Sequence, residues 1–183
     1  MRVFLDFEAS SLSDDSYPVE VGWVFEDGQG ESYLIRPAAA WTEWDAGSQA
    51  IHGIARTTLE AEGEDHAWVA HRVVDQLSGH DLFASAPSWD GKWLSVLLRA
   101  ADLPRHALRL RDTDEALRET AFDVLRPVLP AGELDRAVHN LVARHGTKGD
   151  GPPRHRALAD AMGEHELWRR VRDAALAMAG GAG

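Results

Sequence analysis

An apolar stretch near the start of the chain, residues 3–8, carries two carboxylates, Asp6 and Glu8, two positions apart. Alternate side chains of a β-strand share a face, so this pair would project together. Burial of such acids is costly unless they are protonated, paired with a cation or bound to a metal. With 30 Asp and Glu residues in 183, chance alone yields roughly one Asp-x-Glu. The placement inside an apolar strand therefore makes the pair informative, and it requires partners elsewhere.

Three further residues could supply those partners. Asp90 follows a short apolar strand and opens a helix, although an Asp in that place is also a common helix cap. His155 stands at the start of the last helix, and Asp160 lies inside it. An interval of five residues leaves the last two about 140° apart on a regular helix, so they suit different roles better than joint ligation of one metal.

The composition limits the chemistry. The chain has no Cys, so thiolate zinc sites and disulfides are excluded, and any metal must bind oxygen and nitrogen ligands, which suits Mg²⁺ or Mn²⁺. The formal net charge of -11 argues against a non-specific duplex binder. A pocket could still hold a short single-stranded end through metals and a few local contacts. The basic residues are spread widely, with a modest cluster at Arg105, Arg109 and Arg111.

Hydrophobic patterning predicts an α/β fold in one domain over residues 1–178, followed by a disordered tail at 179–183. A three-stranded antiparallel meander opens the chain, two parallel strands extend the mixed sheet, and helices cover both faces. The expected strands are 3–8, 19–25, 32–35, 81–86 and 107–110, and the expected helices are 65–77, 89–101, 114–125, 133–144 and 156–178. Residues 38–50 read as a loop, and 146–153 as a linker. Neither a signal peptide nor a membrane-spanning run is recognisable, so we expect a cytoplasmic protein without membrane contacts.

The acidic residues and the His, in this order and spacing, resemble the DEDDh-type 3′-to-5′ exonucleases of the ribonuclease H-like superfamily. That group includes the proofreading subunit of bacterial DNA polymerase III, ribonuclease T and oligoribonuclease. The likeness covers residues 1 to about 170, and the segment Ile51-His52-Gly53-Ile54 is similar to the proofreading-subunit branch. The resemblance implies a ribonuclease H-like sheet and release of nucleoside 5′-monophosphates from single-stranded DNA or RNA 3′ ends.

The same resemblance implies a role for each residue. Asp6 would bridge two divalent ions, Mg²⁺ or Mn²⁺, and Glu8 and Asp160 would complete one of the two sites. Asp90 would act mainly through metal-bound water, and His155 would accept the proton of the attacking water, since an imidazole titrates near neutral pH. The residues implied to contact the substrate are Leu12, His52 and Trp89.

Two alternatives stay open at this point. Ala9, Ser11 and Ala86 replace residues usual in the family, and with the acidic surface they favour a nucleic-acid-binding or polymerase-accessory module of low turnover. An oligoribonuclease-like enzyme for short RNA is the other alternative. The acidic balance further indicates that processive binding would need a protein partner. Trp41 and Trp44 could stack on bases or seal a loop, whereas the pattern predicts that Trp68 is a core residue.

Overall fold

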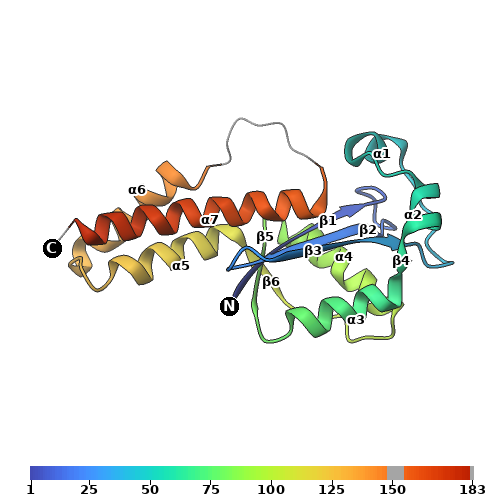
Figure 1. Ribbon diagram of the computed structural model, residues 1–183, viewed down its shortest axis with the longest axis horizontal. Helices are drawn as coiled ribbons and strands as arrows, with labels where there is room; N and C mark the ends of the chain where they lie inside the picture. Colours follow the sequence, from blue (N-terminus) through green and yellow to red (C-terminus); the bar gives the residue numbers. More distant parts are fainter. Residues whose placement is uncertain (148–154, 182–183) are drawn as a thin grey trace.

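The computed structural model describes residues 1–147 and 155–181, and these form a six-stranded mixed sheet with helices on both faces (Figure 1). The strand order is β4-β3-β2-β1-β5-β6. β1, β2 and β3 form the expected antiparallel meander, and β5 and β6 continue the sheet in parallel with β1. The strands are β1 Arg2–Ala9, β2 Pro18–Phe25, β3 Gly30–Arg36, β4 Glu64–Asp65, β5 Asp81–Ala84 and β6 Leu110–Asp112. The predicted fold class is confirmed.

Seven helices lie within the described residues: α1 Ala46–His52, α2 Arg56–Glu62, α3 His66–Leu77, α4 Pro87–Ala100, α5 Thr113–Leu125, α6 Ala131–His145 and α7 Ala157–Gly180. α3 and α4 cover one face of the sheet, while α5 and α7 cover the other (Figure 1). The long α7 begins above the sheet and continues well past it, packed on α5 and α6. None of the helices in these described ranges is long and apolar enough to cross a membrane.

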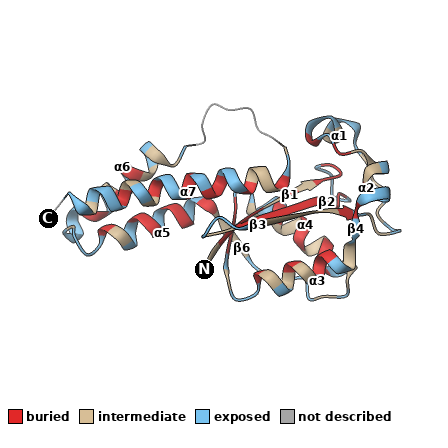
Figure 2. Cartoon of the chain, in the orientation of Figure 1, coloured by how far each residue is buried: buried red, intermediate tan, exposed pale blue. Residues whose placement is uncertain are grey.

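The side chains of β1 alternate between the two faces as its sequence predicts. Val3, Leu5 and Phe7 are buried against α3 and α4, whereas Phe4 is buried against α5 and α7. The strand is accordingly buried along most of its length (Figure 2). Asp6 and Glu8 continue the face that Phe4 begins, so the helix that covers them is α7.

Several element boundaries differ from the sequence-based expectation. The expected loop at 38–50 contains most of α1, which Asp45 caps by accepting a hydrogen bond from the Ser48 N–H, and which Gly53 ends with φ of 71°. The last strand lies at β6 instead of 107–110. Helix α7 continues to Gly180, so the predicted disordered tail is wrong for 179–181; residues 182–183 and 148–153 of the expected linker lie outside the described residues.

Trp41, Trp44 and Trp68 differ in what their rings contact. Trp41 stacks on Tyr17 with ring centroids 5.1 Å apart, and the indole N–H of Trp44 donates to Gln49, so both rings seal the segment before α2. Trp68 is 47% exposed, which corrects the prediction that it belongs to the core. It lies edge-on to Tyr33 at the outer surface of α3.

The first turn of α7 crosses directly over Gly22 of β2. A Cβ at Gly22 would lie 2.6 Å from the Ala157 carbonyl carbon, and closer still to the Leu158 nitrogen. Gly22 is also the cross-strand partner of Asp6. This close approach brings the start of α7 down onto the acidic end of β1.

We expect Gly22→Ala to destabilise the protein by about 3 kcal/mol or more, because the obstructing atoms are backbone and the helix must move as a unit. The free energy of unfolding from urea titration measures the effect. Gly163→Ala on α7 is the matched control: its Cβ meets no atom within 4 Å, so the better helix former should stabilise by about 0.5–1 kcal/mol. Equal stability of wild type and Gly22→Ala would contradict the close packing.

Candidate active site

Asp6, Glu8 and Asp160 converge at the carboxyl end of β1. One carboxylate oxygen from each residue lies within 4.8 Å of the other two. Asp6 and Glu8 come from one face of the strand, and Asp160 comes from the first turn of α7, which the contact at Gly22 holds over that face. Three acids that are far apart in the sequence thus share one small volume.

Asp90 joins this group from the first turn of α4. Its Oδ1 accepts a hydrogen bond from the Phe7 N–H at 3.2 Å, which ties α4 to β1 between the two acids of the strand. The side chain is 2% exposed, and its Oδ2 is buried with no hydrogen-bond partner in the described part of the chain. A buried carboxylate oxygen without a donor is costly, which is the condition that a bound cation or water relieves.

The electrostatics of the four acids reflect their crowding. Burial raises the pKa of Asp6 well above its usual range, and the charges of Asp90, Glu8 and Asp160 raise it further. Burial also raises the pKa of Glu8 to about 7, with Asp160 the largest charge contribution. Burial raises the pKa of Asp90 to about 7, although the hydrogen bond from the Phe7 N–H acts to lower it. The site therefore holds protons near neutral pH unless a cation replaces them.

Glu164 is a fifth acid that the sequence reasoning missed. It is buried on α7 one helical turn after Asp160, and its charge raises the pKa values of Asp6 and Asp90. The i,i+4 spacing from Asp160 was the available signal, since it puts both side chains on the same helix face.

His155 precedes α7 in a left-handed backbone conformation, with φ of 47°. Such a conformation is uncommon for a residue other than glycine and costs about 1–2 kcal/mol, so the neighbouring contacts must hold it. Those contacts come from Arg156, whose backbone N–H donates to Asp160 Oδ2 and whose guanidinium binds Glu20 of β2. His155 therefore directly precedes the residue that ties the start of α7 to Asp160 and Glu20.

His52 lies below the surface at the end of α1. Its side chain is buried, its Nδ1 accepts from the Ile54 N–H at 3.0 Å, and its Nε2 is buried without a hydrogen-bond partner in the described ranges. Burial lowers the pKa of His52, while the charge of Glu20 opposes that shift. The charges of His155 and Arg156 also lower it, which places this imidazole close to the start of α7.

A groove of about 450 Å³ lies between α1 and the β1–β2 connection, the segment that follows the acids of β1 in the chain. Leu12 and Ile51 line it and are 67% and 59% exposed. Helix α1 turns Ile51 outward and its neighbour His52 inward. Because the sequence did not reveal this helix, it could not show that Ile51, and not His52, faces the groove. Lys92 of α4 holds the β1–β2 connection in place by donating to the Ser13 carbonyl and the Ser16 hydroxyl.

Trp89 is a surface residue at the start of α4, immediately before Asp90. Its ring stacks on Trp93 with centroids 5.6 Å apart, and Lys92 Nζ lies 5.1 Å from the Trp89 ring centre. The indole of Trp93 is fixed by donation to the Ser16 hydroxyl. Trp89 is thus held between fixed neighbours while 37% of it stays exposed.

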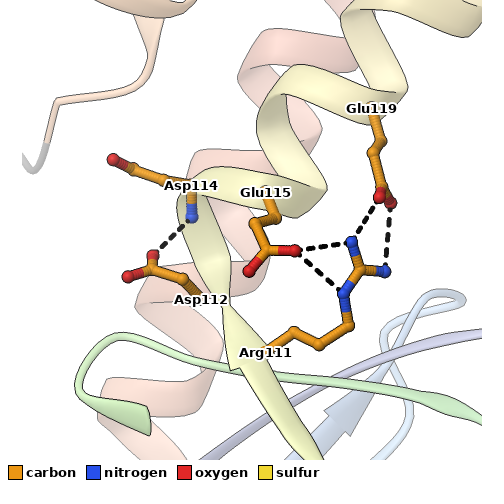
Figure 3. Close-up of polar contacts among 5 residues, drawn as sticks. All are labelled: Arg111, Asp112, Asp114, Glu115 and Glu119. Atoms are coloured by element: carbon orange, nitrogen blue, oxygen red, sulfur yellow. Dashed lines mark hydrogen bonds and ion pairs between the residues drawn. The ribbon is translucent and has the colours of Figure 1, made fainter.

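Arg111, one of the three members of the basic cluster noted in the sequence, is paired with acids of α5. Figure 3 shows Arg111 bound between Glu115 and Glu119 of α5, while Asp112 accepts from the Asp114 N–H to cap that helix. These pairs join β6 to α5. A larger hollow of about 830 Å³ between α5 and α6 shares no residue with the acidic group.

The donor set fits divalent metal ions. Asp6, Glu8 and Asp160 offer closely spaced carboxylate oxygens, and Asp90 adds a buried oxygen that lacks a donor. Oxygen ligands of this kind suit Mg²⁺ or Mn²⁺. Without cations, their mutual repulsion would act against the fold.

The fold and this acidic site together define an α/β protein that gathers carboxylates at one end of its mixed sheet. No protein-family profile matches the sequence, and no curated protein matches it. Among solved structures, the chain is similar to the zinc-bound complex of Escherichia coli exonuclease I with single-stranded DNA, at a TM-score of 0.66 and 18% identity over 94% of this chain and 40% of that one.

Two other structures of exonuclease I give the same picture. The metal-free form of the E. coli complex with single-stranded DNA matches with a TM-score of 0.61 and 20% identity, over 94% of this chain and 41% of that one. A complex of exonuclease I with SSB and an inhibitor matches with a TM-score of 0.62 and 18% identity, over 94% and 41%. The chain thus spans about two fifths of the length of these proteins and shares their fold.

Proposed function

We propose that the protein is a metal-dependent 3′-to-5′ exonuclease that acts on single-stranded ends and releases nucleoside 5′-monophosphates. The observation that carries the proposal is the convergence of Asp6, Glu8 and Asp160 within 4.8 Å, beside the unpartnered oxygen of Asp90. The fold shared with exonuclease I, solved with single-stranded DNA both with zinc and without metal, supports it.

Each residue then has a role that its position allows. Asp6, Glu8 and Asp160 would hold two divalent ions, Mg²⁺ or Mn²⁺, with Asp90 beside them. When bound, such ions neutralise the scissile phosphate, lower the pKa of the attacking water and stabilise the leaving 3′-oxygen. His155, which lies just before the first turn of α7, would accept the proton from that water. The raised pKa values of Glu8 and Asp90 mean that the ions would displace protons on binding.

The groove between the β1–β2 connection and α1 offers a place for the terminal nucleotide. Leu12 and Ile51 present apolar surface to a base, while the exposed part of the Trp89 ring could stack on another base. His52 would support the substrate site indirectly, because it lies under the start of α7. We propose that single-stranded DNA or RNA ends are the substrates, and a protein partner, as in the SSB complex of exonuclease I, would supply binding that this acidic chain lacks.

The test is a digestion of a 5′-labelled single-stranded DNA oligonucleotide with Mn²⁺ or Mg²⁺. We expect a ladder that shortens one nucleotide at a time from the 3′ end, and a 3′-labelled strand should release labelled mononucleotide first. EDTA should stop both reactions. Absence of hydrolysis with either metal, on DNA and on RNA, would overturn the proposal. Dimers and longer oligomers of DNA and RNA, compared side by side, distinguish a short-RNA enzyme from a DNA exonuclease.

A binding or polymerase-accessory module of low turnover is the second candidate. The groove and the Trp89 platform would serve binding without chemistry. Four clustered acids have no use in such a module, because they repel a phosphate backbone when no cation is present. Nucleic-acid binding that persists in EDTA, with no cleavage in metal, would favour it.

A further inference from the structure

Glu20 is a buried carboxylate that the proposed chemistry does not use. It is 2% exposed on β2, where it is the cross-strand partner of Glu8. Directly opposed residues in an antiparallel pair have Cβ atoms about 4.5–5.5 Å apart on the same face. Glu20 therefore lies beside the acids of the site without belonging to the group that converges at Asp160.

The start of α7 occupies both oxygens of Glu20. Arg156 Nε donates to Oε2 at 3.0 Å and to Oε1 at 3.2 Å, Arg156 Nη2 donates to Oε1 at 2.7 Å, and the Ala157 N–H donates to Oε2 at 3.0 Å. No side chain of the N-cap residue caps α7 itself. Glu20 on β2 thus caps the N-terminus of α7 and binds the Arg156 guanidinium at the same time.

Arg156 is also within electrostatic reach of the site. Its charge lowers the pKa of Glu8, whose own charge raises that of Arg156. The Arg156 side chain is 52% exposed, so it has room to turn. A guanidinium carries five donors and pairs readily with carboxylates in bidentate geometry. Released from Glu20, it would find Glu8 as the next carboxylate on the same face.

We propose that Glu20 is a positioning residue that keeps the Arg156 guanidinium away from Glu8, and so leaves Glu8 available to a divalent cation. The same contact seats the first turn of α7, which carries Asp160, beside Asp6. The inference rests on the proposed function only in treating the acidic group as a metal site. It makes the cation affinity of the site depend on a residue that does not touch the cation.

The test compares Mn²⁺ binding to the protein without nucleic acid, measured by calorimetry or by electron paramagnetic resonance of free Mn²⁺. In Glu20→Gln, Arg156 should pair with Glu8, and the Mn²⁺ affinity should fall about tenfold. In the double variant Glu20→Gln/Arg156→Gln, which lacks the competing guanidinium, the affinity should return to within about threefold of wild type. Glu31→Gln is the matched control, because Glu31 binds Arg72 in the same bidentate way on β3, away from the site.

The outcomes separate this role from a structural one. If Glu20 only supports the helix, the double variant binds Mn²⁺ as weakly as Glu20→Gln or more weakly, and the proposal is overturned. Unchanged affinity in Glu20→Gln also overturns the proposal. A wild type that binds no Mn²⁺ overturns it as well. If Glu20→Gln does not fold by circular dichroism, Arg156→Gln replaces it and should bind Mn²⁺ at least as tightly as wild type. A wild type that binds Mn²⁺ but hydrolyses nothing would refute the proposed function and leave this comparison valid.

Discussion

Asp6→Asn should lower the rate of 3′-end hydrolysis by about 10³-fold or more while the protein remains folded. Asp6 is central to the acidic group, since the charges of Asp90, Glu8 and Asp160 all act on it. The substitution keeps the size of the side chain and removes the charge that would hold a divalent ion against the phosphate. Initial rates on a 3′-labelled single-stranded oligonucleotide measure the loss at saturating Mn²⁺.

The variant should also unfold at a higher temperature than wild type in EDTA at pH 8, because an unfavourably buried charge is gone. Asp75→Asn is the matched control: this Asp is exposed on α3, so neither rate nor stability should change measurably. Persistence of wild-type hydrolysis in Asp6→Asn would remove the acid group from the reaction. Lost activity together with a lowered melting temperature would instead indicate a structural role for Asp6.

The sheet was predictable because its signals are local. The alternation along β1 and the Asp-Gly turn at Gly28 depend on neighbouring residues, and the structure keeps both. The face shared by Asp6 and Glu8 follows from the same period of two. Strand alternation therefore sufficed to predict which two acids point toward the helix that carries Asp160.

The parts of the fold and of the site that the sequence did not predict depend on contacts between distant segments. Nothing near Glu20 in the sequence shows that it binds Arg156, 136 positions later, and nothing near Gly22 shows that a helix crosses it. Helix α1 was missed because it has only seven residues and one buried member, His52, so it lacks an apolar stripe. That omission hid Ile51, which lines the groove next to α1.

The stability of the metal-free protein should depend on pH through Asp90 in a direction opposite to that of most acids. Its pKa is raised to about 7 in the fold, so the folded state holds a proton that the unfolded chain has lost. Stability from this group is complete below about pH 4, falls as pH rises toward 7, and is then constant. A shift of this size corresponds to an upper limit on the order of 4 kcal/mol.

Other groups titrate in the same experiment, so the measurement is the difference between wild type and Asp90→Asn. The lowered pKa of His52 makes stability rise with pH near 6, and the lowered pKa values of Glu31 and Glu115 act below about 4.5; all three are common to both proteins. The Asp90 charge also raises the pKa values of Asp6 and Glu8, so its removal lowers both and adds to the advantage of the variant as pH rises. Urea titrations in EDTA should give equal stabilities at pH 4 and an advantage for Asp90→Asn that grows until about pH 7.5. Mn²⁺ at pH 8 should reverse the order, because folded wild type, with one more carboxylate, binds the cation more tightly and is stabilised more by it. A difference that does not change between pH 4 and 7.5 would show that Asp90 is ionised in the fold at low pH, and that the site is prepared for its cation before any proton has to leave.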